Sequence, residues 1–290
     1  MPRVPANGLE LEYDTFGDPA NPPLVLVMGL GAQMITWEPG FCELLAAKGF
    51  HVVRFDNRDV GLSSYLDDLP VPDLAAILAG DTSSAPYLLS DFADDTVGLF
   101  DALGFERAHV VGASMGGMIV QQLAIDHPDR LLSVTSIMAT TGDRAVGRPE
   151  PWALAILMRA PAETREQAIA DAAAAFRSLG SPAYPDTEEF LTAKATALYD
   201  RAQYPAGALR HSAAIAASGD RTEALRRVRL PVVVVHGDAD PLVNISGGKA
   251  TADAIPDAEL VVIPGMGHNL PHPVWPEVVE AIVRATSRAR

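Results

Sequence analysis

The sequence GASMG at residues 112–116 places a serine between two glycines, at the spacing of a sharp nucleophile turn. It follows an apolar run at residues 108–111 that is expected to form a strand, and it precedes residues 117–126, which have helical character. Such a turn exposes the serine hydroxyl, and flanking glycines let the backbone segments approach closely. A glycine-rich loop with an incidental serine is the alternative, but the flanking elements favour Ser114 as a nucleophile.

A serine hydroxyl needs an adjacent base in order to attack at neutral pH. Among the seven histidines, His268 lies in the loop PGMGH directly after the predicted strand Leu260–Ile263. Parallel sheets present functional groups at this carboxyl end of their strands, so His268 is the expected base. His272, in a proline-flanked turn, is the alternative. The other histidines have structural explanations, at the start or end of strands and helices or within the helical region: His51, His109, His127, His211 and His236.

Two carboxylates follow the predicted strand at residues 232–237, within the segment GDADP. Asp240 lies far enough from the strand to turn back and orient an imidazole on the next loop. Asp238 is closer to the strand and is expected to cap the turn, although it remains the alternative acid. The predicted order is Ser114, Asp240 and His268, with separations of 126 and 28 residues.

Two backbone N–H groups are candidates for stabilising a negatively charged oxygen. The Met115 N–H lies at the start of the helix after Ser114, where the helix dipole favours negative charge. The second donor is expected in the loop after an early strand. The segment VMGLGA at residues 27–32 is such a loop, and the Leu30 N–H is the candidate.

Short apolar runs alternate with helical segments along most of the chain. Each run is continuously apolar, as in a parallel sheet covered by helices on both faces. This order predicts a doubly wound, mostly parallel α/β sheet, with Leu9–Phe16 as an antiparallel edge strand. The predicted strands are Leu24–Met28, Val52–Asp56, Ala108–Gly112, Val134–Met138, Val232–Gly237 and Leu260–Ile263, and the predicted helices include Phe41–Lys48, Ser90–Leu103, Gly117–Asp126 and Glu277–Arg288.

Residues 141–229 interrupt this alternation with an alanine-rich helical pattern punctuated by proline and glycine. The sequence therefore predicts a core of residues 1–140 and 230–290 with a helical cap of residues 141–229 inserted in it. Most apolar cap residues are expected to pack the cap onto the core, and some to line a substrate pocket. The expected cap helices are Trp152–Arg159, Thr164–Leu179, Glu188–Arg201 and Ala206–Ala217.

The composition restricts the classes of partner. The chain has 22 basic and 37 acidic residues and a net charge of −15, which disfavours nucleic acid and anionic membranes. Without a signal peptide or a long apolar run, a cytoplasmic protein is expected. The single cysteine, Cys42, is expected to be a buried structural thiol. No metal-ligand spacing or nucleotide-binding glycine motif is present, so no cofactor or metal is expected.

Several segments together resemble the α/β-hydrolase family over nearly the whole chain. They are residues 27–29, FDNRDVGLS at residues 55–63, the serine turn, HGDAD at residues 236–240 and GMGH at residues 265–268. Most members have His-Gly where this chain has Met28-Gly29. That departure, with FGDP at residues 16–19, is similar to the branch containing aclacinomycin methylesterase. Enzymes of that branch cleave a methyl ester on a polycyclic polyketide. The resemblance covers the core and implies an α/β-hydrolase fold that cleaves a carboxylic ester, but it specifies neither the alcohol nor the acyl part.

These expectations combine into a serine hydrolase that cleaves a carboxylic ester of a medium-sized apolar substrate through an acyl-enzyme. The same three residues also suit cleavage of a C–C bond, a thioester or perhydrolysis, and a slow-turnover ligand receptor is a further alternative. The polar residues Asp56, Asn57 and Arg58 are expected to brace neighbouring loops rather than to take part in catalysis. The pattern leaves the oligomeric state open between monomer and dimer.

Overall fold

In the computed structural model, which describes residues 1–160 and 162–289, eight strands form one sheet in the order β1-β2-β4-β3-β5-β6-β7-β8. The strands are β1 Arg3–Ala6, β2 Leu9–Phe16, β3 Pro23–Val27, β4 His51–Phe55, β5 Ala108–Ala113, β6 Leu131–Ile137, β7 Val232–Gly237 and β8 Glu259–Ile263. Strands β3 to β8 run parallel to one another, whereas β2 pairs antiparallel with both β1 and β4. The predicted mostly parallel α/β sheet is therefore confirmed.

The antiparallel strand Leu9–Phe16 was expected at the edge of the sheet, and that expectation is wrong. It pairs with β4 on one side and with β1 on the other, so β1 is the edge strand. Asn7 and Gly8 connect β1 to β2 with positive φ angles of 49° and 79°. An Asn-Gly pair with this geometry forms the tight turn of a hairpin, and the four-residue strand before it was too short to stand out in the sequence.

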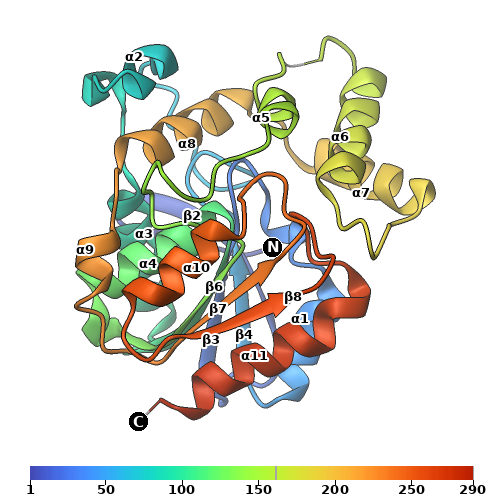
Figure 1. Cartoon of the computed structure of the whole chain (residues 1–290). Helices are drawn as coiled ribbons and strands as arrows, with labels where there is room; N and C mark the ends of the chain where they lie inside the picture. Colours follow the sequence, from blue (N-terminus) through green and yellow to red (C-terminus); the bar gives the residue numbers. More distant parts are fainter. Residues whose placement is uncertain (161, 290) are drawn as a thin grey trace.

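Helices cover both faces of the sheet, as the continuous apolar strands predict (Figure 1). Along β3, Leu24 and Leu26 belong to one apolar core, and Val25 and Val27 belong to the other. The first core is completed by α1 Pro39–Ala47 and α11 Trp275–Ser287. The helices on the second face are α3 Leu89–Leu103, α4 Met115–Asp126 and α10 Ser246–Ala254. Because successive strand side chains point to opposite faces, a fully apolar strand serves both layers.

The segment between β6 and β7 contains helices and no strand among its described residues. These helices are α5 Pro151–Leu157, α6 Arg165–Leu179, α7 Glu188–Arg201, α8 Pro205–Ala217 and α9 Thr222–Leu225. Figure 1 shows α5 to α8 grouped at the end of the molecule away from the C-terminus, beside α2 Leu74–Leu78. The division into a core and a cap of residues 141–229 stays a prediction.

The inserted helices have a small apolar core of their own, in which Ile169 and Ala173 of α6 pack against Leu191 and Ala195 of α7. Apolar residues of α5 were expected to pack the insertion onto the sheet domain. Trp152, Leu154, Leu157 and Met158 instead remain 45–60% exposed. The helix has only seven residues, and only Ala153 within it is buried.

Cys42 lies fully buried on α1, and burial raises the pKa of its thiol to about 12. It is therefore a structural thiol, as predicted. Within residues 1–160 and 162–289, no helix combines the length and the apolar character needed to cross a membrane.

Candidate active site

Ser114 lies at the turn between β5 and α4, with φ 58° and ψ −121°. A positive φ is strained for a residue with a side chain and is typical of functional turns. Steric contacts exclude a side chain at both flanking positions. A Cβ at Gly112 would overlap the carbonyl of Gly116, and one at Gly116 would overlap the carbonyl of Val27. The turn thus presents the Ser114 hydroxyl at the carboxyl end of β5.

The structure brings the three predicted site residues together. His268 Nε2 lies 2.9 Å from Ser114 Oγ, and His268 Nδ1 lies 2.8 Å from Asp240 Oδ2. Ser114 and His268 are partly accessible, and Asp240 is 5% exposed. The arrangement allows His268 to accept the hydroxyl proton at Nε2 while its Nδ1–H donates to the carboxylate.

The two carboxylates after β7, Asp238 and Asp240, have different hydrogen-bond partners. Asp240 Oδ1 accepts hydrogen bonds from the N–H groups of Leu242 and Val243, both at 2.8 Å, which leaves Oδ2 directed at His268. Asp238 Oδ1 accepts from the Gly265 N–H at 2.6 Å. The sequence-based choice of Asp240 over Asp238 therefore agrees with the geometry, and Asp238 braces the loop that leads to His268.

The alternative base His272 does not approach the nucleophile. Its Nε2 lies 2.7 Å from Glu38 Oε2, and its side chain is 52% exposed. His236 is buried beside the acid, with Nε2 3.7 Å from Asp240 Oδ2 and 2.7 Å from the Val243 carbonyl. Burial lowers the pKa of His236, so it is a neutral donor to that carbonyl.

The loop after β3 passes directly beside the nucleophile. A Cβ at Gly29 would lie 3.0 Å from Ser114 Cβ, which explains the absence of a side chain there. Within the described chain, the N–H groups of Leu30 and Met115 have no hydrogen-bond acceptor, and both belong to backbone next to Ser114. Their assignment as donors to a negatively charged oxygen stays a prediction.

The sequence pattern of the alpha/beta hydrolase fold matches residues 22–272. The chain belongs to this family. It is 31% identical to a rhodomycin D methylesterase of Streptomyces sp. (strain C5), and 30% identical to another of Streptomyces peucetius, over 94% of each chain in both cases. The predicted likeness to methylesterases of this fold is thus confirmed.

More distant relatives include a 3-oxoadipate enol-lactonase of Acinetobacter baylyi, 27% identical over 89% of this chain and 86% of that protein. Among solved structures, the enol-lactonase from Burkholderia xenovorans LB400 superposes with a TM-score of 0.78. That structure is 24% identical and is covered completely, with 99% of this chain matched. These relatives are hydrolases, and the superposition supports the fold.

The polar segment after β4 braces the hydrolase site, as expected from the sequence. Asp56 accepts hydrogen bonds from the Met34 and Leu62 N–H groups at 2.7 and 2.9 Å. Asn57 donates to the Met28 carbonyl at 2.9 Å, next to the loop that carries Leu30. These contacts fix loops around the site without placing a charged side chain beside Ser114 Oγ.

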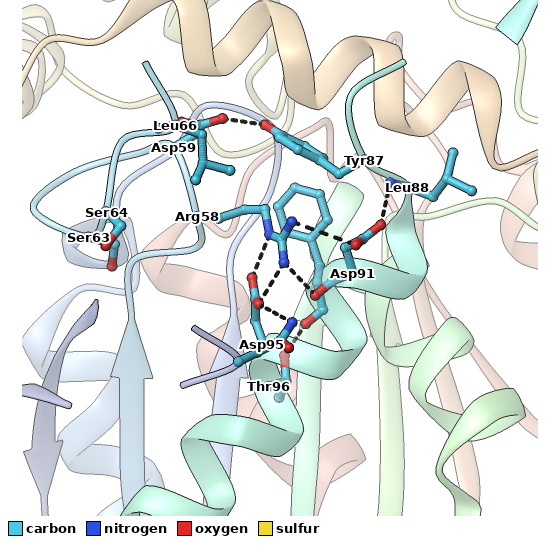
Figure 2. A network of polar contacts seen from close by, with 12 residues as sticks. Arg58, Asp59, Ser63, Ser64, Leu66, Tyr87, Leu88, Asp91, Asp95 and Thr96 are labelled. Atoms are coloured by element: carbon cyan, nitrogen blue, oxygen red, sulfur yellow. Dashed lines mark hydrogen bonds and ion pairs between the residues drawn. The ribbon is translucent and has the colours of Figure 1, made fainter. Parts of the chain in front are cut away.

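Arg58 extends the bracing to α3 (Figure 2). Its guanidinium donates to both carboxylate oxygens of Asp95, at 2.6 and 2.7 Å, and to the Asp91 carbonyl at 3.0 Å. Asp59 accepts from the Tyr87 hydroxyl at 2.7 Å and from Arg210 of α8 at 2.8 and 3.1 Å. Burial alone raises the pKa of Asp59, but these donors hold that pKa below its usual range.

A hollow of about 300 Å³ adjoins the acid loop of the hydrolase. Ala239 and Pro241, the chain neighbours of Asp240, line it together with residues of α5, α6 and α7 and of the loop that joins α6 to α7. Its apolar side chains are Trp152, Phe176, Pro182, Pro185 and Leu191. Arg177 and Asp186 also line the hollow, so charged groups stand beside the apolar ones.

Sequence reasoning missed the contacts between the inserted helices and the loops around Ser114 and His268, of which two are side-chain acceptors. His211 on α8 accepts a hydrogen bond from the Gly31 N–H, and Ser181 after α6 accepts one from the Gly267 N–H. Each joins residues at least 86 positions apart in the chain. No local pattern signals such a pair, so only the tertiary structure reveals it.

Proposed function

We propose that this hydrolase is a serine carboxylesterase that cleaves the methyl ester of a medium-sized apolar carboxylic acid. The observation that carries the proposal is the 2.9 Å separation of Ser114 Oγ and His268 Nε2, with Asp240 on the opposite ring nitrogen. A hydroxyl, a base and an orienting acid in this order are the requirements for nucleophilic acyl transfer.

The reaction begins when His268 Nε2 accepts the Ser114 proton and Oγ attacks the ester carbonyl. Asp240 stabilises the imidazolium through the Nδ1–H hydrogen bond. The Leu30 and Met115 N–H groups hold the tetrahedral oxyanion, and each such donor lowers the activation barrier by about 3–4 kcal/mol. His268 then gives its Nε2 proton to the methoxide oxygen as the C–O bond breaks, and methanol departs. A water molecule repeats the sequence on the acyl-enzyme to release the acid and free Ser114.

Two observations support the substrate class. The methylesterase relatives act, by name, on rhodomycin D, and they match 94% of this chain. The hollow beside Asp240 is walled largely by aromatic, aliphatic and proline side chains, which suit an apolar acyl group. Methanol is a small leaving group, so the acyl side of the ester needs the larger space.

The proposal is tested by treating the purified protein with a fluorophosphonate probe and with p-nitrophenyl and methyl esters of increasing acyl size. We expect labelling and a burst of product from the wild type, and neither from Ser114→Ala. His268→Ala should be inactive, and His272→Ala, which changes a histidine bound to Glu38, should retain activity and serves as its control.

The outcomes separate the alternatives. Labelling without ester turnover, combined with cleavage of a β-diketone, hydrolysis of a thioester or perhydrolysis, would keep the nucleophile and replace ester hydrolysis as the reaction. Binding of an apolar ligand without any turnover would indicate a receptor. No labelling of well-folded wild type would overturn the proposal.

A further inference from the structure

His211 on α8 has two hydrogen bonds and no contact with solvent. It is fully buried, its Nδ1 lies 3.1 Å from the Gly31 nitrogen, and its Nε2 lies 2.8 Å from the Arg58 carbonyl oxygen. Gly31 directly follows Leu30 in the loop beside Ser114. A side chain of the inserted helices therefore reaches the loop that carries a predicted oxyanion donor.

The two hydrogen-bond partners fix the tautomer of His211, and burial keeps the ring uncharged. The Gly31 N–H is a donor, so Nδ1 must be an unprotonated acceptor, and the Arg58 carbonyl requires a proton on Nε2. Burial lowers the pKa of His211 to about 4, which keeps the ring neutral. Phe92 and Tyr87 pack edge-to-face on it, with centroids 5.0 and 6.5 Å away. The ring is held in one orientation.

The backbone of Gly31 fits closely against the same helix. Its φ is +61°, and a Cβ there would lie 3.0 Å from Ala208 Cβ on α8. The neighbouring helix residue, Arg210, is anchored to Asp59 of the sheet domain through two hydrogen bonds. Helix α8 is thus fixed to the sheet domain by Arg210, and through His211 it fixes the Leu30–Gly31 peptide.

We propose that His211 is a positioning residue for the oxyanion hole. By binding the Gly31 N–H, it fixes the peptide plane next to the one that carries the Leu30 N–H, so that this donor points to the oxygen of the tetrahedral intermediate. The inference rests on the proposed function only in assigning Leu30 as an oxyanion donor. Because the charge develops only in the transition state, a small displacement of such a donor lowers the rate of reaction more than it weakens substrate binding.

The test compares His211→Ala, His211→Met and His211→Gln with His109→Gln. Alanine and methionine remove both hydrogen bonds, and methionine also fills the space if alanine does not fold. Glutamine has one acceptor and one donor, about as far apart as the two ring nitrogens. His109 is the matched control: it is also buried, its Nδ1 lies 2.8 Å from Ser133 Oγ, and burial also lowers its pKa to about 4.

For a p-nitrophenyl ester we expect kcat to fall on the order of 10- to 100-fold in His211→Ala and His211→Met, with KM changed less than about threefold. The fluorophosphonate labelling rate of Ser114 should fall in parallel, since the phosphonyl oxygen uses the same donors. His211→Gln should recover part of the loss, and the apparent pKa in the kcat profile should stay that of wild type. His109→Gln should lower the melting temperature but keep kcat.

The labelling rate keeps the two proposals distinct. If the wild type is labelled but cleaves no ester, the proposed substrate is wrong, and the His211 variants are still compared by labelling. If folded His211→Ala and His211→Met match His109→Gln in both kcat and labelling rate, or if only KM changes, the positioning role is overturned. A wild type that is not labelled overturns both proposals.

Discussion

The hydroxyl of Ser181 accepts a hydrogen bond from the Gly267 N–H at 2.9 Å and donates one to Asn269 Oδ1 at 2.5 Å. Ser181 lies between α6 and α7, and the two partners flank His268. The His268 N–H also donates to the Leu179 carbonyl at 2.8 Å. The loop that carries the base is thus held by the inserted helices as well as by the sheet.

Replacing Ser181 should loosen this loop. Ser181→Ala leaves the buried Gly267 N–H without an acceptor, so we expect the free energy of unfolding to fall by about 1–3 kcal/mol. kcat should fall several-fold, and Ser181→Thr should restore most of it. Ser287→Ala, which changes an exposed serine at the end of α11, is the control. Urea unfolding and ester kinetics measure both effects, and equal kcat values for the two alanine variants would contradict the prediction.

The two carboxylates after β7 offer a matched comparison. Asp240→Asn replaces the acceptor of the His268 Nδ1–H and favours the wrong tautomer, so kcat should fall on the order of 10⁴-fold. Asp238→Asn changes only the carboxylate bound to the Gly265 N–H, and should reduce kcat far less. Steady-state kinetics with one ester measures both. Comparable losses in the two variants would argue against Asp240 as the orienting acid.

The buried pair of Arg210 and Asp59 should be more important for stability than an exposed pair of similar geometry. Both side chains are at most 2% exposed, and removal of Arg210 leaves a buried carboxylate without its cation. We expect Arg210→Ala to lower the free energy of unfolding by about 3–5 kcal/mol. Arg165 pairs with Asp200 through two hydrogen bonds of 2.8 and 2.7 Å, but on the surface.

Arg165→Ala is therefore the control, and its urea midpoint should stay close to wild type. The double variant Arg210→Ala, Asp59→Asn should be more stable to urea than Arg210→Ala alone, because no uncompensated charge remains buried. An Arg210→Ala midpoint as close to wild type as that of Arg165→Ala would show that the buried pair does not stabilise the fold.

Stability should decrease in mild acid because of two buried histidines. His109 and His211 have pKa values of about 4 in the folded chain, whereas the ordinary value is 6.5. As the pH falls from 6.5 toward 4, the unfolded chain binds protons that the folded chain does not. Each histidine then lowers the free energy of unfolding by about 1.4 kcal/mol per pH unit.

Urea unfolding at several pH values between 7 and about 4.5 measures this slope. The double variant His109→Gln, His211→Gln should show a smaller slope than wild type. A slope that is unchanged in the double variant would mean that other groups dominate the acid sensitivity.

The sequence alone predicted the parallel sheet, the serine turn and the three residues that the structure brings together. Continuous apolar strands indicate burial on both faces, and the turn at Ser114 needs glycines at two nearby positions, so both signals are local. The carboxyl ends of parallel strands then bring Ser114, Asp240 and His268 to one edge. This follows from topology, although the residues are far apart in the chain.

Only the tertiary structure decided how the inserted helices meet this edge. His211 with Gly31 and Ser181 with Gly267 are single hydrogen bonds between distant segments, and neither changes the local periodicity or the turn signals. The exposure of α5 and the edge position of β1 likewise depend on what packs against them. Propensity and pattern describe a residue's neighbours in sequence, whereas these features depend on its neighbours in space.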